Sequence, residues 1–421
     1  MSNDSGLKQL NNLAWSLQRT GWQYFMANDP KNKENVPKEQ QSPLSAIAEA
    51  YKQSETYEPP KNDYELFFFQ DPFALDLEPS DSRNASNLPD VLDLIKRIFA
   101  MSRRGFDTLV FGPTGIGKTL LARSVAAAYD QGYIDRKTVY IDAATSEEDF
   151  WTNIYTSELV IIDNAAPIWM QSIAPPIDGS RNRATVAAFL SYFDYKRLTD
   201  WSKNMGFSNF PLLGSTDYKK IPVPSFSERS IVDILRTRIT ASCREAVGTC
   251  GFSNESLFEI ARYSIGLPSL ALLIARDVLG EFVSSHEISE DISASFVHEV
   301  VRGSPYSMAH ALVRSVNTAE ILIDAESRIK LTMGSTRMEV LVTMAQMAFS
   351  RGNSRFGPFS VERQALEQEL GKPSSTISHH AQKLIAAGLL QAQREGNTVS
   401  YLLSTPVYHA LELLSYPYLK S

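Results

Sequence analysis

The segment from Phe106 to Thr119, FDTLVFGPTGIGKT, decides the fold class expected for this chain. Its β-branched and aromatic beginning, Phe106 to Phe111, predicts a strand. The pattern G-x-x-x-x-G-K-T follows, and Leu120 to Tyr129 predicts a helix behind it. A strand, a glycine-rich turn and a helix in this order indicate a phosphate-binding loop, because inward-turned N–H groups and the helix dipole both attract anions.

This P-loop predicts a site for the phosphates of ATP or ADP and for Mg²⁺. The glycines let the backbone turn its N–H groups inward, Lys118 reaches the β- and γ-phosphates, and the Thr119 hydroxyl coordinates Mg²⁺. The expected nucleotide-binding residues are Gly112, Pro113, Thr114, Gly115, Ile116, Gly117, Lys118, Thr119 and Leu120. A purely structural glycine turn is the alternative, and the strand and helix that flank the motif disfavour it.

Other short apolar runs predict the rest of a sheet around this loop. The expected strands are Thr138 to Asp142, Glu158 to Asp163, Phe210 to Gly214 and Lys220 to Pro224. An amphipathic helix, Leu88 to Met101, precedes the loop. Because strands alternate with helices, residues 86–225 are expected to form an α/β domain with a parallel sheet.

Asp163 ends the apolar run ELVIID and is expected to hold Mg²⁺ through the water shell of the ion, which makes it a metal-binding and catalytic candidate. The next residue is Asn164, whose amide cannot act as the base that activates water. Glu158 and Asp194 are alternative bases that the sequence does not rank. We therefore expect ATP hydrolysis to be slow at most.

Residues 165–208 form a long connection, which in a compact domain is usually functional or mobile. A helix is expected from about Thr185 to Trp201. Arg181 and Arg183 lie in the basic first part of the connection. Two alternatives remain for them, a contact to a phosphate of nucleotide or DNA and an ordinary solvated loop.

Helical patterns follow the expected sheet. Residues 226–300 predict a lid that begins with a capping serine, and residues 301–334 predict a connecting helical stretch. Before the sheet, residues 1–85 predict a helical and linker extension. Four phenylalanines of this extension are expected to pack on the core or, alternatively, to contact an adenine: Phe67, Phe68, Phe69 and Phe73.

The last part of the chain, residues 335–421, predicts a winged helix-turn-helix domain. Three helices are expected, at Thr336 to Phe349, Val361 to Glu369 and Ser374 to Ala387. Ser374 or Ser375 is expected to cap the third helix, and Gly388 to end it. The segment LLQAQREGNTVSYLLS then predicts two strands joined around Gly396.

The motifs together resemble the AAA+ superfamily, and within it the archaeal origin-recognition initiator ATPases and the related STAND ATPases. The resemblance is carried by GPTGIGKT, TVYIDA, ELVIID, LLGSTD, VPSFSERSIVDILRTRI and GLPSLALLIARDVL, over residues 86–300. The C-terminal phrases STISHHAQKLIAAGLL and QREGNTVSYLL resemble the ArsR and MarR repressors. An α/β P-loop core with a helical lid and a C-terminal winged helix-turn-helix is the fold that these resemblances imply.

The repressor resemblance implies which residues face double-stranded DNA. The third helix would enter the major groove, and the hairpin would approach phosphate or the minor groove. The implied DNA-binding residues are Ser375, Thr376, Ser378, His379 and Lys383 on the helix and Arg394 and Asn397 on the wing. Ile377, Leu384 and Ile385 would face the core of the domain.

Several positions depart from the initiator pattern. Ser269 stands where a sensor 2 arginine is expected, with Arg262 and Arg276 as the nearest alternatives. The sensor 1 residue, which would face the γ-phosphate, falls at Thr216 or Asp217, and Thr216 is the second catalytic candidate. No clear arginine finger lies between residues 214 and 222. These departures favour a nucleotide-gated switch over a fast motor.

Charge and composition limit the partners that we expect. The whole chain has a net charge of −7, but residues 335–421 hold eight Lys or Arg and six Asp or Glu, so a DNA contact is expected at this end only. The chain has two cysteines, no signal-peptide pattern and no run of 18 apolar residues. A cytoplasmic protein without a membrane partner is expected, and the resemblance allows a homo-oligomer.

The sequence therefore predicts an ATP-dependent AAA+ protein that binds double-stranded DNA, most similar to a replication initiator, with the nucleotide as a conformational switch. Two alternatives stay open. One is a STAND-type transcription regulator that ATP binding activates. The other is a non-catalytic ATP-binding assembly protein whose winged helix contacts other proteins.

Overall fold

The computed structural model describes Phe73 and residues 89–128, 138–142, 157–165, 184–204, 219–242, 251–285, 291–314, 320–324, 329–350, 359–396 and 398–417. Several predicted features lie outside these residues. They are the extension before Phe73, the strand at Phe210 to Gly214, and the side chains of Phe67, Phe68, Phe69, Arg181, Arg183, Thr216, Asp217 and Asn397.

The first described part is a five-stranded parallel sheet in the order β2-β3-β4-β1-β5. Its elements are α4 (Pro89–Arg103), β1 (Thr108–Gly112), α5 (Lys118–Ala128), β2 (Thr138–Asp142), β3 (Leu159–Asp163), β4 (Thr185–Ser191), α8 (Tyr192–Asn204) and β5 (Lys219–Pro222). This arrangement confirms the predicted fold class, an α/β core in which a parallel sheet carries the P-loop.

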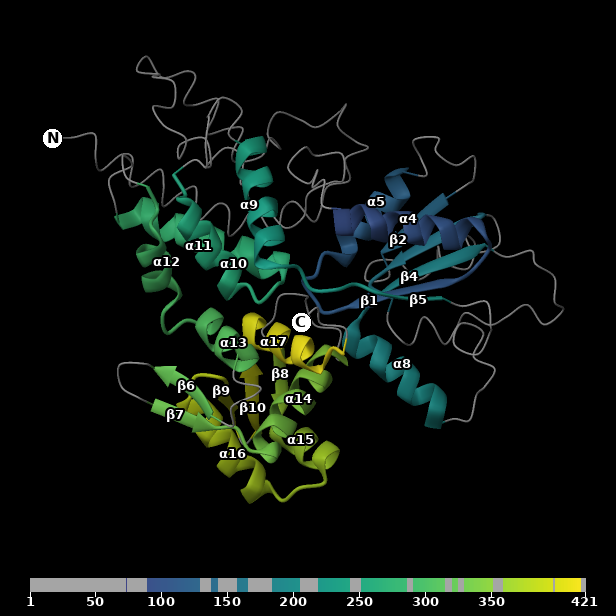
Figure 1. Cartoon of the computed structure of the whole chain (residues 1–421). Coiled ribbons are helices and arrows are strands. Elements are labelled where there is room, and N and C mark those ends of the chain that lie inside the picture. Colours follow the sequence, from purple (N-terminus) through teal and green to yellow (C-terminus); the bar gives the residue numbers. More distant parts are fainter. Residues whose placement is uncertain are drawn as a thin grey trace, which may run out of the picture.

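The two faces of this sheet are covered by different helices (Figure 1). Leu94 and Ile98 of α4 and Val125 of α5 pack with β1 and β3 on one face. Leu198 of α8 packs with the other face. All five positions of β1 and of β3 are buried, as a central parallel strand requires.

The helix predicted from Thr185 to Trp201 is wrong in its first half. Thr185 to Ser191 form β4, which pairs with both β3 and β1, and the helix α8 begins only at Tyr192. The run TVAAFLS is almost entirely buried. A strand that is apolar on both faces has no alternation, so periodicity alone cannot distinguish it from a buried helix.

The described residues of the lid form four helices, α9 (Glu228–Ser242), α10 (Asn254–Tyr263), α11 (Pro268–Ser285) and α12 (Ala294–Val301). The predicted cap is present, because the backbone N–H of Ser230 donates to Ser227 Oγ at 3.1 Å. Phe73 is buried in the apolar core of the lid and meets the Phe252 ring edge-on, with 5.8 Å between the ring centroids. For Phe73, the predicted packing role is therefore confirmed.

The connecting stretch predicted as helical is helical only in part. Pro305–Arg314 form α13, but β6 (Glu320–Asp324) and β7 (Ile329–Thr332) form an antiparallel pair. The sequence analysis overlooked this pair, since two short strands are stable only against neighbours that a local pattern does not show. Met308, Ala309 and Leu312 of α13 lie in the apolar core of the C-terminal region.

The C-terminal region, residues 305–417, contains the three helices and the hairpin that the sequence predicts. Its elements from residue 335 onward are α14 (Ser335–Ser350), β8 (Phe359–Glu362), α15 (Arg363–Leu370), α16 (Ser374–Ala386), β9 (Gln391–Glu395), β10 (Thr398–Leu403) and α17 (Thr405–Ser415). The three strands form an antiparallel sheet in the order β8-β10-β9.

Three details of this region differ from prediction. Val361 belongs to β8 rather than to a helix, because it pairs with Tyr401 of β10. The N-cap of α16 is Pro373 and makes no side-chain bond, so neither Ser374 nor Ser375 is the cap. The third difference is α17, which the sequence analysis did not predict and which packs chiefly on α13. Gly388 has φ +73 directly after α16, as expected for the residue that ends it.

Candidate functional site

The predicted P-loop lies at the carboxyl end of β1 and leads directly into α5. Gly115 and Gly117 adopt φ +82 and +95, a conformation that glycine adopts without strain. Lys118, the first residue of α5, donates from Nζ to the carbonyls of Gly112 at 2.9 Å and Pro113 at 2.8 Å. The lysine is thus held over the loop whose N–H groups would surround an anion.

Asp163 ends β3, two strands away from the P-loop strand in the sheet. Its side chain is 1% exposed and accepts hydrogen bonds from the Tyr140 hydroxyl at 3.1 Å and the Asn164 backbone N–H at 2.9 Å. Burial raises the pKa of Tyr140 above its usual value, and the Asp163 carboxylate raises it further. Tyr140 therefore remains a neutral donor that fixes this carboxylate.

Asn164 is turned away from a role beside Asp163. Its backbone has φ +54, which asparagine tolerates better than most residues, and its Nδ2 donates to Asp142 Oδ1 at 2.7 Å. Asp142 ends β2, on the outer side of β3. The amide thus joins the ends of two strands.

Glu158 and Asp194, the two alternative bases, lie at opposite ends of the parallel strands. Glu158 precedes β3 and is exposed at its amino end, whereas Asp194 lies in the first turn of α8, just after β4. Ser191 Oγ donates to Asp194 Oδ2 at 2.8 Å, and the Asp194 backbone N–H donates back to that hydroxyl at 3.0 Å. Of the two, only Asp194 lies at the edge of the sheet that carries the P-loop.

The environment of Asp194 is unusual for a carboxyl group. Burial raises its pKa to about 7, and the nearby Glu412 carboxylate also raises it, while the Ser191 hydrogen bond, Arg197 and Lys118 lower it. The strand that ends beside this residue is the fourth of the sheet. Thr216, predicted as sensor 1, lies outside the described residues, so its role stays a prediction.

The lid contacts the P-loop through the turn that contains Ser269. The Ser269 backbone N–H donates to the Gly115 carbonyl at 3.1 Å. A Cβ at Gly115 would collide with Ser269 Oγ and lie 3.3 Å from Cε1 of His409. The position expected for a sensor 2 arginine is therefore in contact with the loop, but a short hydroxyl occupies it.

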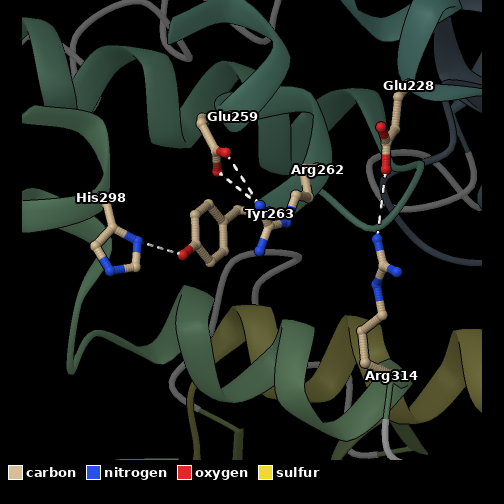
Figure 2. A network of polar contacts seen from close by, with 6 residues as sticks. All are labelled: Glu228, Glu259, Arg262, Tyr263, His298 and Arg314. Carbon is tan, nitrogen blue, oxygen red and sulfur yellow. Dashed lines mark hydrogen bonds and ion pairs between the residues drawn. The ribbon is translucent and has the colours of Figure 1, made fainter. Parts of the chain in front are cut away.

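Arg262 is engaged within the lid (Figure 2). It pairs with Glu259 of its own helix at 3.0 Å, while the neighbouring Tyr263 hydroxyl bonds His298 Nδ1 at 2.8 Å. To the right of them in Figure 2, Arg314 of α13 lies 3.6 Å from Glu228 of α9. These contacts join lid helices to one another and to α13. They leave Arg262 in the lid network rather than at the P-loop.

Helix α17 brings a carboxylate to the P-loop. Glu412 is 0% exposed, and its Oε2 accepts the Thr114 backbone N–H at 2.7 Å. Its Oε1 accepts the backbone N–H groups of Tyr192 at 2.8 Å and Phe193 at 3.3 Å, the first two residues of α8. A side chain about 300 positions along the chain thus joins the P-loop to the start of α8.

Two further residues near α17 complete this contact. Burial lowers the pKa of His409 to about 3, and the Lys118 ammonium lowers it as well. The Tyr416 hydroxyl, just beyond α17, donates to the Val223 carbonyl at 2.9 Å and the Phe111 carbonyl at 3.3 Å. None of these contacts of Glu412, His409 and Tyr416 was predicted from the sequence. The available signal was Pro406 near the start of an apolar helical pattern that carries a histidine and a glutamate.

The predicted DNA-facing residues lie mostly on one exposed face of α16. Ser375, His379 and Lys383 are exposed, and Ile377 and Leu384 are buried in the domain core as expected. Ile385 packs against that core. Thr376 and Ser378 are half-buried, and Ser378 hydrogen-bonds Tyr401, whose pKa burial raises. Arg394 is exposed on β9.

The described residues contain neither a metal-binding cluster of side chains nor a membrane-spanning helix. No group of three or more His, Cys, Asp or Glu side chains in this part of the chain could by itself hold a metal ion. None of the described helices has the length and apolar character needed to cross a membrane.

The sequence model of one protein family, described as RNA helicase, matches residues 108–172 of the chain. This segment begins with β1 and contains the P-loop and Asp163. No curated protein sequence matches the chain.

Several solved structures are similar to this one at low sequence identity. The RuvB Holliday junction branch migration motor of Thermotoga maritima is 17% identical over 78% of this chain and 95% of that chain, with a TM-score of 0.38. The ORC2 protein of Aeropyrum pernix, in ADPNP–ADP complexes, is 15% identical over 82% of this chain and 96% of that chain, with a TM-score of 0.40. Cdc6p of Pyrobaculum aerophilum is 15% identical over 81% of this chain and 96% of that chain, with a TM-score of 0.41. Because these TM-scores are low, the fold assignment rests on the strand order and the loop geometry.

Proposed function

We propose that this chain is an AAA+ protein that binds ATP or ADP with Mg²⁺ and binds double-stranded DNA through its C-terminal region. The nucleotide serves as a slow conformational switch, as in a replication initiator. The observation that carries the nucleotide part is the P-loop itself. It joins a buried strand to a helix, has two glycines at positive φ, and holds Lys118 over the loop carbonyls.

The residues of this edge fit a magnesium nucleotide. Residues 112–120 would surround the phosphates with N–H groups and the ammonium of Lys118. The Thr119 hydroxyl would coordinate Mg²⁺, and Asp163 would hold its water shell, with Tyr140 fixing the carboxylate. The ion supplies charge neutralisation for the phosphates. Because nucleotide oxygens and water complete such a site, a cluster of three protein carboxylates is not required.

The residues at the positions of the usual catalytic base and sensor 2 arginine support slow hydrolysis. The amide of Asn164 bonds Asp142, so the position after Asp163 offers no base. Ser269 replaces a sensor 2 arginine at the P-loop. Asp194 is the alternative base that lies at this edge, and its raised pKa of about 7 suits a base near neutral pH. A switch that holds its nucleotide for a long time needs no faster chemistry.

The DNA part rests on the shape and exposed face of the C-terminal region. The order helix, strand, helix, helix and hairpin is that of a winged helix-turn-helix, and α16 presents exposed Ser375, His379 and Lys383. Side chains at the beginning of such a helix reach base edges, and wing residues such as Arg394 reach the backbone. Asn397, three positions after Arg394 in the sequence, is proposed to act with it.

The nucleotide proposal is tested by equilibrium titration with MgATP and MgADP. We expect Lys118→Ala to lose more than about 100-fold in affinity, because the side chain provides the charge opposite the β- and γ-phosphates. The matched control is Lys96→Ala on the exposed face of α4, which should bind as the unmodified protein does. Unchanged affinity in Lys118→Ala would refute the assignment.

The DNA proposal is tested by footprinting at low salt, with ATP turnover measured in parallel. Protection of clustered repeats near a replication start supports an initiator. A promoter footprint supports the second candidate, an ATP-gated regulator of the STAND type, which the contact between α17 and the P-loop favours. Absence of DNA binding at low salt excludes both and leaves an assembly protein whose winged helix contacts other proteins.

A further inference from the structure

The Glu412 carboxylate accepts a backbone N–H of the P-loop, a donor that the proposed function assigns to the phosphates. That N–H belongs to Thr114, and the carboxylate also accepts the first two N–H groups of α8. We propose that Glu412 is an intramolecular competitor of the nucleotide phosphates, so that α17 must leave the P-loop before MgATP can bind fully. This inference deepens the proposed function, on which it rests, by assigning the regulation of the same site.

The chemistry of the contact is that of anion recognition. The N–H groups of a P-loop and the N-terminus of a helix both attract negative charge, and here one carboxylate satisfies donors from both. Glu412 is completely buried, so water does not screen it. A phosphate placed beside it would meet a like charge at short range and would lose the Thr114 N–H as a donor. The carboxylate and the phosphates therefore exclude one another.

The contact between α17 and the P-loop contains several hydrogen bonds and also several buried polar atoms without partners. Glu412 has three backbone donors, and Tyr416 ties the end of α17 to the carbonyls of Phe111 and Val223. Within the described part of the chain, both ring nitrogens of His409 and the Ser269 hydroxyl are buried without hydrogen-bond partners. Unsatisfied buried polar atoms weaken the closed arrangement. An interface of this kind can open when a better anion arrives.

Release of α17 would move the C-terminal region with it. Val407, Tyr408 and Leu411 of α17 lie in the apolar core that also contains α13, α14 and α16. The contact to the sheet is made by a different set of residues, Glu412, Leu413 and Tyr416. Since α17 follows β10 after a single residue, opening would reposition the wing and α16 together. Nucleotide binding is thereby coupled to the orientation of α16, the helix proposed to face DNA.

The first test is Glu412→Gln in the full-length chain, titrated with MgATP. Glutamine keeps the size of the side chain but removes the charge and one of the two acceptor oxygens. If the carboxylate competes with phosphate, the variant binds MgATP about tenfold more tightly, because a larger fraction of molecules is open. Glu299→Gln is the matched control. It makes the same charge change at an exposed position of α12, and its affinity should equal that of the unmodified protein.

The second variant weakens the contact without touching the phosphate site. Tyr416→Phe removes the hydroxyl that bonds Phe111 and Val223 but keeps the aromatic ring. We expect a several-fold gain in MgATP affinity from the same shift toward the open form. Amide exchange supplies an independent readout. Saturating MgATP should speed exchange in residues 405–417 of the unmodified protein, and Glu412→Gln should show fast exchange there without nucleotide.

The outcomes separate this inference from the proposed function. If Glu412→Gln and Tyr416→Phe bind MgATP no more tightly than the unmodified protein, while Lys118→Ala still abolishes binding, the competition is refuted and the nucleotide site stands. Unchanged exchange of residues 405–417 on saturation with MgATP refutes it as well. If neither the unmodified protein nor Glu412→Gln binds MgATP, the nucleotide site itself is refuted, and the competition with it.

Discussion

Two helices of the C-terminal region, α16 and α17, carry polar residues in opposite environments. On α16, Ser375, His379 and Lys383 are exposed to solvent. On α17, His409 is 1% exposed and Glu412 is 0% exposed, because the helix lies between its own domain and the P-loop. The two helices lie in one domain but differ in what their polar side chains meet.

This difference separates two kinds of recognition. A polar face left in water keeps its hydrogen-bonding groups available for a partner from outside, which for α16 is proposed to be DNA. A buried polar residue must find its partner inside the protein or lose free energy, and Glu412 finds three N–H donors on two other elements. Exposure therefore predicts an external ligand, whereas burial identifies an internal contact.

The largest expected effect breaks the packing of α17. Leu411→Ala should lower the free energy of unfolding by about 3 kcal/mol, because a fully buried leucine of the core is replaced and a cavity remains. Urea denaturation at neutral pH measures it. Gln382→Ala, on the exposed face of α16, is the control and should change stability by less than about 0.5 kcal/mol. Equal losses in the two variants would show that α17 is not buried as described.

The second effect is the pH dependence of the free energy of unfolding that arises from His409 of α17, compared with that from His379 of α16. The folded protein protonates His409 only near pH 3, whereas an ordinary histidine has a pKa of 6.5, so its stability falls as the pH drops below 6.5. The expected loss from this residue is about 2 kcal/mol between pH 6.5 and pH 5. It is measured as the difference in unfolding free energy between the unmodified protein and His409→Gln at each pH.

The control for this comparison is His379→Gln, the same substitution on the exposed face of α16. It should change the free energy of unfolding by less than about 0.5 kcal/mol at neutral pH, as expected for an exposed position. Other groups also titrate in this range. Burial lowers the pKa of His310 to about 4 and raises that of Asp194 to about 7, and taking differences between variants removes their contributions. An identical pH profile for His409→Gln and the unmodified protein would contradict the buried, neutral imidazole.

The smallest effect tests the outward face of α16. Lys383→Ala should weaken DNA binding by about tenfold at moderate salt, and the slope of log affinity against log salt should fall by about one, as for the loss of one phosphate contact. Lys196→Ala, at an exposed position of α8 beside the parallel sheet, is the matched control. If both variants bind DNA alike, the α16 face is not the DNA surface.

Much of the sheet was predictable because its strands are short, apolar and placed between recognisable turns. Thr138 to Asp142 was predicted with the bounds that the structure has, and the strands ending at Gly112 and Asp163 were predicted within two residues. The failure at β4 has a physical cause. Val186 to Leu190 are buried on both faces, so they carry no alternation that would distinguish a strand from a helix.

The candidate site was predictable only where its residues are close in sequence. Residues 112–119 form one continuous loop, so their spacing alone predicts a phosphate-binding site. Asp194 and Ser269 were named from their local context, but their distance from the P-loop depended on which segment became the fourth strand and how the lid turned. Glu412 was not foreseen, because nothing near it in sequence indicates an anion-binding partner.

The sequence by itself determined the P-loop motif, the aspartate that ends β3 and the pattern of a helix, a turn, a helix and a hairpin. Each of these is a local property, fixed by backbone conformation and by the periodicity of apolar residues. Only the tertiary structure decided that α17 lies on the P-loop and that the Glu412 carboxylate meets the Thr114 N–H. That contact depends on how two domains pack, and a burial that distant segments create together leaves no mark in the local pattern of either one.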